Sequence, residues 1–441
     1  MEKNTGKLLT PTAGTPLDYL RWRGDLSFVR DGFNEVDNLI LCIISYLNFR
    51  RIDAVHTKTP ALAPTLAEVA PLLTEEDDQL GLSELSYLPL LRLAAQTERF
   101  RELRLFGYTH EYDAECAKQF DALSFLVPDG TLFVAFMGTD TSLAGWKEDF
   151  NMSFLSAVPA QERAVSYAGE MAELCPGLPL RIGGHSKGGN LAAWAAIHLP
   201  ADLQTGRLLD AYNNDGPGFA RDMLETPEYL RVSGKLHTYI PESSIVGVLL
   251  EHAEDYAVID SANRSVMQHE PLSWNVVGTK FVHLGQRSQM GRLSDDVLRE
   301  WIGSMSPAER AQFTDALFDM LSLSGKARTL DDLRSGRFSG GAALLKQYAG
   351  ADEEQKKIIN EVFRRLAVDV KAELKKAAGE SLEGVKKAAG ESFEAAKNAL
   401  SSLTRADREN YSPAAITPVL SCRFAARTYS LRSPHALQST A

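Results

Sequence analysis

The residues best suited to chemistry lie in one segment, where an apolar run leads into Gly-His-Ser-Lys-Gly and a helix rich in small residues follows. This order of strand, sharp turn and helix is the setting of the G-x-S-x-G nucleophile elbow. Ser186 must project from a strained turn, and Gly184 and Gly188 leave room where a Cβ would collide. The segment therefore predicts Ser186 as the nucleophile of a covalent mechanism.

A serine nucleophile needs a general base, and His269 is the candidate that chain order favours. It follows the last predicted strand, as the order of serine, acid and histidine requires for this type of elbow. We expect His185, next to the nucleophile, to point elsewhere because side chains alternate along a strand. The remaining histidines are weaker candidates because of their places in the chain: His198, His237, His252 and His283.

Two carboxylates compete to orient this base. Asp215 follows the first strand after the elbow helix, and the Gly-Pro-Gly turn behind it would hold the carboxylate rigidly. Glu242 follows the next strand, the more usual position of the acid in such a fold, and is the alternative. We favour Asp215, although it could instead cap its own loop. Asp255 and Asp260 are the next candidates.

Donors for an oxyanion are expected from the backbone. One is the N–H of Lys187, the residue after the nucleophile, at the start of a helix whose free N–H groups favour negative charge. The other is the N–H of Met137 or Gly138, in the turn Phe-Met-Gly-Thr-Asp that ends a predicted strand.

The elements that must position these residues alternate between strand and helix. Helices are predicted from Asn34 or Asp37 to Leu47 and over residues 159–174, and Pro-Asp-Gly predicts a hairpin between two strands. Strands are expected at residues 103–108, 122–127, 132–136, 208–212, 236–240 and 256–260, and directly before the elbow. Such alternation favours an α/β fold with a mainly parallel sheet, which binds ligands beyond the carboxyl ends of its strands.

The chain divides into a core domain and a helical C-terminal part. The expected units are a flexible N-terminus (1–15), the α/β domain with an N-terminal helical cap (16–290), a helical extension (291–350), a long amphipathic helix (351–404) and a disordered tail (405–441). The heptamer Lys-Lys-Ala-Ala-Gly-Glu-Ser recurs within the long helix after 11 residues. We expect that helix to self-associate or to pack on the body, with contact to a membrane surface as the alternative.

Composition narrows the partners. The net charge of −11 argues against nucleic acid. The 4 cysteines show no metal-binding spacing, and neither a P-loop nor H-E-x-x-H occurs, so no metal or cofactor is expected. No secretory signal is evident and the longest apolar run near the N-terminus is too short for a membrane span, which predicts a cytoplasmic protein.

Several motifs resemble a known family. Asp-Tyr-Leu-Arg-Trp-Arg-Gly-Asp-Leu-Ser-Phe, Gly-His-Ser-Lys-Gly-Gly-Asn-Leu-Ala, Asn-Asp-Gly-Pro-Gly-Phe and Gln-His-Glu-Pro-Leu-Ser-Trp are similar to the Mbeg-like family of bacterial α/β-hydrolase-fold proteins. The resemblance covers roughly residues 15 to 370. Phe-Met-Gly-Thr-Asp, Trp146 with Asp149, and Gly-His-Ser-Lys-Gly-Gly also resemble the fungal-type class of triacylglycerol lipases more distantly.

The chain departs from those lipases at three positions. Glu242-Ser-Ser-Ile-Val stands where the lipases carry Asp-x-Val-Pro, and Met137 replaces an arginine. Lys187 stands beside the nucleophile where the lipases have an apolar residue; we expect its side chain to be solvated, with attraction of an anionic substrate as the alternative.

The resemblance implies a serine hydrolase with an α/β-hydrolase fold. Together with the residues above, it predicts hydrolysis of a small-molecule or lipid carboxylic ester through an acyl-enzyme on Ser186. The alternative is a catalytically silent hydrolase scaffold that acts as an interaction or membrane-surface protein through its C-terminal helix.

Overall fold

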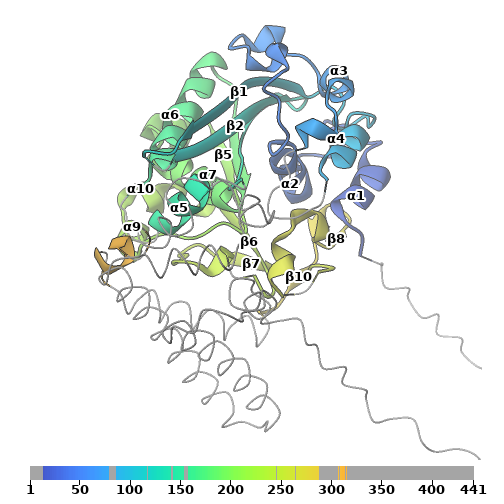
Figure 1. Ribbon diagram of the computed structural model, residues 1–441. Coiled ribbons are helices and arrows are strands. Elements are labelled where there is room, and N and C mark those ends of the chain that lie inside the picture. Colours follow the sequence, from blue (N-terminus) through green and yellow to red (C-terminus); the bar gives the residue numbers. More distant parts are fainter. Residues whose placement is uncertain are drawn as a thin grey trace, which may run out of the picture.

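The computed structural model gives the fold of the core domain (Figure 1). It describes residues 13–78, 86–116, 118–140, 143–152, 157–244, 246–263, 265–287, 306, 308–312 and 314. The predicted long helix (351–404) and tail (405–441), and most of the predicted extension (291–350), lie outside these residues.

Eight described strands form one sheet, in which neighbours follow chain order until the last strand. They are β1 (Arg104–Asp113), β2 (Lys118–Val127), β3 (Thr131–Phe136), β4 (Leu180–His185), β5 (Leu208–Asn214), β6 (Leu236–Pro241), β7 (Tyr256–Ile259) and β10 (His283–Leu284). The strands from β3 to β7 are parallel, whereas β1, β2 and β10 pair antiparallel. A separate pair consists of β8 (Val276–Val277) and β9 (Lys280–Phe281). The predicted mainly parallel sheet is confirmed.

Helices cover both faces of this sheet. The α-helices are α1 (Pro16–Arg23), α2 (Glu35–Ile44), α3 (Leu66–Val69), α4 (Leu88–Ala94), α5 (Leu143–Asn151), α6 (Pro159–Leu174), α7 (Lys187–His198), α8 (Ala201–Gly206), α9 (Arg221–Leu224) and α10 (Pro227–Val232). The 3₁₀ helices are η1 (Asp53–His56), η2 (Pro60–Leu62), η3 (Ala70–Leu72), η4 (Glu75–Asp77), η5 (Ser233–Lys235), η6 (Val246–Val248), η7 (Ser265–His269) and η8 (Pro271–Ser273). Figure 1 shows α6 and α7 on one side of the sheet and α2 and α4 on the other.

The side chains of β3 show how the sheet divides two hydrophobic cores. Phe133 and Ala135 belong to the cluster that contains α2, whereas Leu132, Val134 and Phe136 belong to the cluster that contains α6 and α7. This division follows from the alternation of side chains along a strand. A sheet covered on both faces is the architecture that buries apolar strands completely.

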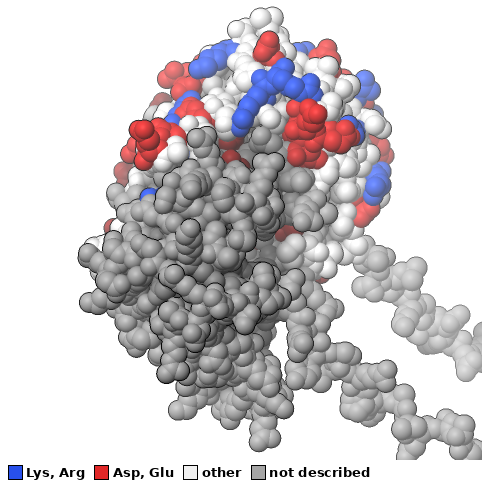
Figure 2. Space-filling model, in the orientation of Figure 1, with Lys and Arg blue, Asp and Glu red and all other residues white. Residues whose placement is uncertain are grey.

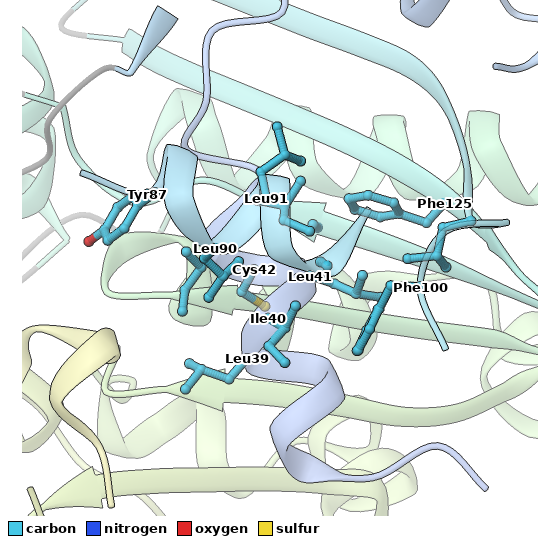
Figure 3. Close-up of a cluster of buried hydrophobic side chains, with 14 of the residues drawn as sticks. Leu39, Ile40, Leu41, Cys42, Tyr87, Leu90, Leu91, Phe100 and Phe125 are labelled. Atoms are coloured by element: carbon cyan, nitrogen blue, oxygen red, sulfur yellow. The ribbon is translucent and has the colours of Figure 1, made fainter. Parts of the chain in front are cut away.

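Helix α2 begins where the sequence predicts. The side chain of Asn34 accepts hydrogen bonds from the N–H groups of Val36 and Asp37, and the Asp37 carboxylate accepts from the Asn34 N–H, which is a capping box. The helix from Val36 to Ile44 is buried on all sides. Figure 3 shows α2 packed with residues of α4 and with two phenylalanines: Leu39, Ile40, Leu41, Cys42, Leu90, Leu91, Phe100 and Phe125.

The predicted N-terminal cap is therefore a flanking layer of the core. A buried ion pair fixes it, because Arg99 donates to both carboxylate oxygens of Asp37 and neither side chain is exposed. Gly14, at the end of the stretch predicted to be flexible, pairs with Val276 of β8 through two backbone hydrogen bonds. Gly14 thus lies next to the part of the chain that follows η7.

Candidate active site

The predicted elbow joins β4 to α7 at the carboxyl edge of the parallel strands. Ser186 is the N-cap of α7 and has a φ of 60° and a ψ of −133°, a strained conformation for a residue with a side chain. A Cβ on Gly184 would lie 2.0 Å from the Gly188 carbonyl oxygen, and one on Gly188 would lie 2.1 Å from that of Phe136. Both glycines are therefore required by the close approach of backbone, as the sequence predicts.

Asp215 lies directly after β5 and is completely buried. Its carboxylate accepts hydrogen bonds from the Ser244 hydroxyl at 2.6 Å and the Gly247 N–H at 3.1 Å. The turn behind it is capped by Asn213, whose side-chain oxygen accepts from the Gly216 N–H at 2.8 Å. The loop is therefore capped by the side chain of Asn213 and not by that of Asp215. The Asp215 carboxylate bonds other partners instead.

His269 ends η7 and directs Nδ1 at Asp215, with 2.6 Å between Nδ1 and Oδ2. A carboxylate oxygen only accepts, so Nδ1 carries a proton, and the neutral tautomer with this proton has its lone pair on Nε2. Of the two carboxylates left open by the sequence, Asp215 forms this bond. Glu242 lies half-buried after β6, with its backbone N–H donated to the Ile259 carbonyl oxygen.

The other sequence candidates lie elsewhere. The competing histidines engage other partners: His198 stacks on Trp194, His237 bonds Asp210, His252 bonds Glu254 and His283 bonds Glu35. Asp260 accepts from the Asn275 side chain at 2.8 Å, and Asp255 is exposed.

The expectation that Lys187 is solvated, or available to an anionic substrate, is wrong. Its side chain is 1% exposed and its ammonium donates to the Gln119 carbonyl and side-chain oxygens and to Glu148 Oε2 at 3.1 Å. Burial opposes the charged form, but the carboxylates of Glu148 and Asp149 outweigh it and raise the pKa of Lys187. The lysine beside the nucleophile therefore anchors the elbow to β2 and α5.

The turn after β3 contains one donor that is already used. The Met137 N–H donates to the Asp121 carbonyl oxygen at 3.0 Å, because the β2–β3 ladder extends past the strand end, so in this conformation it does not serve as an oxyanion donor. Gly138 lies against the nucleophile, since a Cβ there would be 3.1 Å from Ser186 Cβ. The next residue, Thr139, donates its hydroxyl to Asp149 of α5, which fixes the turn.

Asp149 has an unusual environment. Within the described ranges its Oδ1 is buried without a hydrogen-bond partner, while Oδ2 accepts from Thr139. Burial raises the pKa of Asp149 to about 7, and the Lys187 charge offsets only part of this effect. A protonated Asp149 at neutral pH would leave Glu148 as the main counter-charge of Lys187.

Two further side chains, His185 and Tyr46, lie at the site. The sequence analysis expected His185 to point elsewhere and did not identify Tyr46. The His185 ring lies against the His269 ring, with centroids 4.6 Å apart, and not away from the site as alternation suggested. The Tyr46 hydroxyl lies 2.9 Å from His185 Nδ1. No motif marks Tyr46, since it follows α2 and is more than a hundred residues from the elbow.

The described residues contain neither a metal-binding cluster nor a membrane-spanning helix. In that part of the chain, His, Cys, Asp and Glu side chains form no group of three or more that could hold a metal ion. Within the same ranges, no helix combines the length and the apolar character that crossing a bilayer requires.

On the face that Figure 2 shows, Lys and Arg side chains lie beside Asp and Glu.

A family profile matches part of the chain, and a solved structure shows a limited likeness to it. The profile of the family described as Mbeg1-like matches residues 94–319. Among solved structures, a crystal structure of M37 lipase is similar, with 15% identity over 48% of this chain and 68% of that chain and a TM-score of 0.29. No curated protein matches the chain. Because the family match spans half of its length and includes the elbow, Asp215 and His269, the chain belongs to the Mbeg1-like family of proteins.

Proposed function

We propose that the protein is a serine hydrolase that acts on small-molecule or lipid carboxylic esters through an acyl-enzyme on Ser186. The observation that carries the proposal is the His269–Asp215 hydrogen bond of 2.6 Å beside a strained elbow. His185, the residue before Ser186, contacts the His269 ring, which brings base and nucleophile into one neighbourhood. A serine, a histidine and a buried carboxylate in these roles constitute a catalytic triad.

The proposed reaction runs in two halves. The His269 Nε2 lone pair takes the Ser186 proton as Oγ attacks the ester carbonyl, and the resulting imidazolium donates Nδ1–H to Asp215. The tetrahedral intermediate expels the alcohol, which receives the proton from His269. Water then attacks the acyl-enzyme with the same base and releases the acid. Asp215 accepts the Nδ1–H throughout, and its carboxylate is held in place by the Ser244 hydroxyl and the Gly247 N–H.

The oxyanion would be bound by backbone donors at the end of the elbow. We assign one to the Lys187 N–H, at the first position of α7, where helix geometry leaves N–H groups without intrahelical partners. Because the Met137 N–H is used by Asp121, the second donor is assigned to Gly138 or Thr139. Loss of one such donor costs about 3 kcal/mol of transition-state stabilisation.

The first test compares hydrolysis of p-nitrophenyl esters, from acetate to palmitate, by the wild type and Ser186→Ala. We expect Ser186→Ala to abolish turnover and to prevent labelling by a fluorophosphonate. Ser166→Ala is the matched control, since that hydroxyl is exposed and bonds the Glu162 carbonyl oxygen on α6.

Two outcomes would contradict the proposal. One is a wild type that neither hydrolyses any ester of the series nor reacts with the fluorophosphonate. The other is activity that survives in Ser186→Ala. The first outcome favours the scaffold hypothesis, in which the fold is retained without chemistry.

A further inference from the structure

The His185 ring contacts the segment that carries the base. Its Nε2 lies 2.8 Å from the His269 carbonyl oxygen, and its ring is tilted by 33° against the His269 ring. A carbonyl oxygen only accepts, so His185 Nε2 must carry a proton. Burial, with the neighbouring His269, lowers the pKa of His185 well below its usual value. The ring is therefore neutral, and its Nδ1 must accept.

Tyr46 supplies the donor that this tautomer needs. Its hydroxyl lies 2.9 Å from His185 Nδ1 and 3.2 Å from the His185 carbonyl oxygen. Burial raises the pKa of Tyr46 well above its usual value, so the hydroxyl keeps its proton and donates. A neutral histidine with one fixed donor and one fixed acceptor has a single tautomer and orientation.

The Tyr46 hydroxyl also lies next to the nucleophile. A Cβ on Gly138 would be 2.2 Å from this hydroxyl and 3.1 Å from Ser186 Cβ, so both groups lie against the same side of Gly138. Tyr46 thus contacts the elbow and the turn assigned to the oxyanion, in addition to the histidine that holds the base.

Other side chains secure the same segment, and one of them, Trp274, also lies edge-on against the His185 ring, with the ring centroids 6.0 Å apart. Trp274 donates its indole N–H to the Gln268 carbonyl oxygen at 3.0 Å, and Tyr87 donates to Glu270 at 3.3 Å. These contacts hold the neighbours of His269 in the chain. The contact from His185 joins the His269 main chain and ring to the strand end before Ser186.

We propose that Tyr46 and His185 are positioning residues for the base: the Tyr46 hydroxyl selects the His185 tautomer, and His185 holds His269 against the elbow. The role assigned to His269 rests on the proposed function. Without the hydroxyl, His185 has a buried nitrogen without a donor and can rotate or change tautomer, which places a lone pair opposite the His269 carbonyl oxygen.

The first measurement is the rate at which a fluorophosphonate labels Ser186 in the full-length protein, followed by intact mass. We expect Tyr46→Phe and His185→Phe to reduce the maximal rate about 10-fold to 100-fold with little change in the concentration for half-maximal rate, because the base is misplaced while the binding site remains. His185→Gln should retain more of the rate, since its amide can still donate to His269. Tyr167→Phe is the matched control: it removes a buried hydroxyl that bonds the Gly107 carbonyl oxygen.

The second measurement needs no turnover. The Nδ1 proton of His269, in a bond of 2.6 Å to Asp215, should give a downfield proton resonance in protein labelled with ¹⁵N-histidine, assigned by its loss in Asp215→Asn. We expect this resonance to shift or broaden in Tyr46→Phe and His185→Phe, and to be unchanged in Tyr167→Phe.

The two measurements separate the two proposals. A wild type that is not labelled removes the proposed function, while the resonance still tests the positioning role. Tyr46→Phe that folds, labels at the wild-type rate and keeps the resonance unchanged would overturn the inference. If thermal unfolding shows that Tyr46→Phe does not fold, the test becomes the comparison of His185→Phe with His185→Gln. Equal labelling rates and equal His269 resonances in these two variants would overturn the inference.

Discussion

Asp215 accepts the Nδ1–H of His269 from a backbone position with a φ of 55°, a conformation that residues with side chains rarely adopt. Ser186, after the neighbouring parallel strand, has a φ of 60°. Strain therefore occurs at the ends of both β4 and β5, where the side chains must leave the strand and turn toward the same edge. Such strain is characteristic of functional sites, because the rest of the fold must maintain it.

Asp215→Asn should reduce kcat about 10³-fold to 10⁴-fold with little change in KM, because the amide would favour the wrong His269 tautomer. Ester hydrolysis and fluorophosphonate labelling measure this. Asp260→Asn is the matched control, since that carboxylate bonds Asn275 and not His269. Full activity in Asp215→Asn combined with its loss in Glu242→Gln would move the acid to Glu242.

Lys187→Met should lower the free energy of unfolding by about 3–5 kcal/mol, because it leaves the buried Glu148 carboxylate without its cation. Urea denaturation measures the effect. Lys118→Met, which breaks the partly exposed pair with Glu111, should cost at most about 1 kcal/mol. An equal effect of the two substitutions would show that burial of the Lys187 charge is not decisive.

Asp149→Asn should change the pH dependence of stability. The carboxyl has a folded-state pKa raised to about 7, against about 4 in an unfolded chain, so the folded state binds the proton more tightly. Relative to Asp149→Asn, the wild type should be most stable below about pH 4 and should lose stability as the pH rises to about 7. Urea denaturation of both proteins at several pH values measures the difference, and parallel curves would contradict it.

Gly188→Ala should abolish activity and strongly reduce folding yield, since its Cβ would lie 2.1 Å from the Phe136 carbonyl oxygen. Gly206→Ala, in α8, meets nothing within 4 Å and should leave stability within about 1 kcal/mol of the wild type. Soluble yield and thermal unfolding report the contrast. A folded Gly188→Ala would mean that the elbow has room to relax.

The sequence indicated much of this arrangement because the relevant signals are local. The elbow is predictable because one short turn needs glycine at 184 and 188, where backbone approaches closely, and a projecting serine at 186. The start of α2 after Asn34 is predictable because a capping box spans only four residues. The flanking strands follow from apolar runs and a Pro-Asp-Gly turn.

The remaining features depend on contacts between distant parts of the chain. Asp215 and Glu242 each follow a strand, and only the three-dimensional arrangement brings Asp215 into contact with His269. The partner of Lys187, Glu148, precedes it by 39 residues in the sequence, so the surroundings of that lysine were not evident. Tyr46 reaches His185 across 139 residues, and no periodicity records such a contact.

The buried layer formed by α2 also bears on where this protein could be shortened. A fragment trimmed to residues 94–319, the part that matches the family, would lack α2 and would retain Arg99 without Asp37. Phe125 and Phe133 would then face water. The cooperative folding unit therefore extends upstream of the stretch by which the family is identified, and fragments for expression should begin before α1.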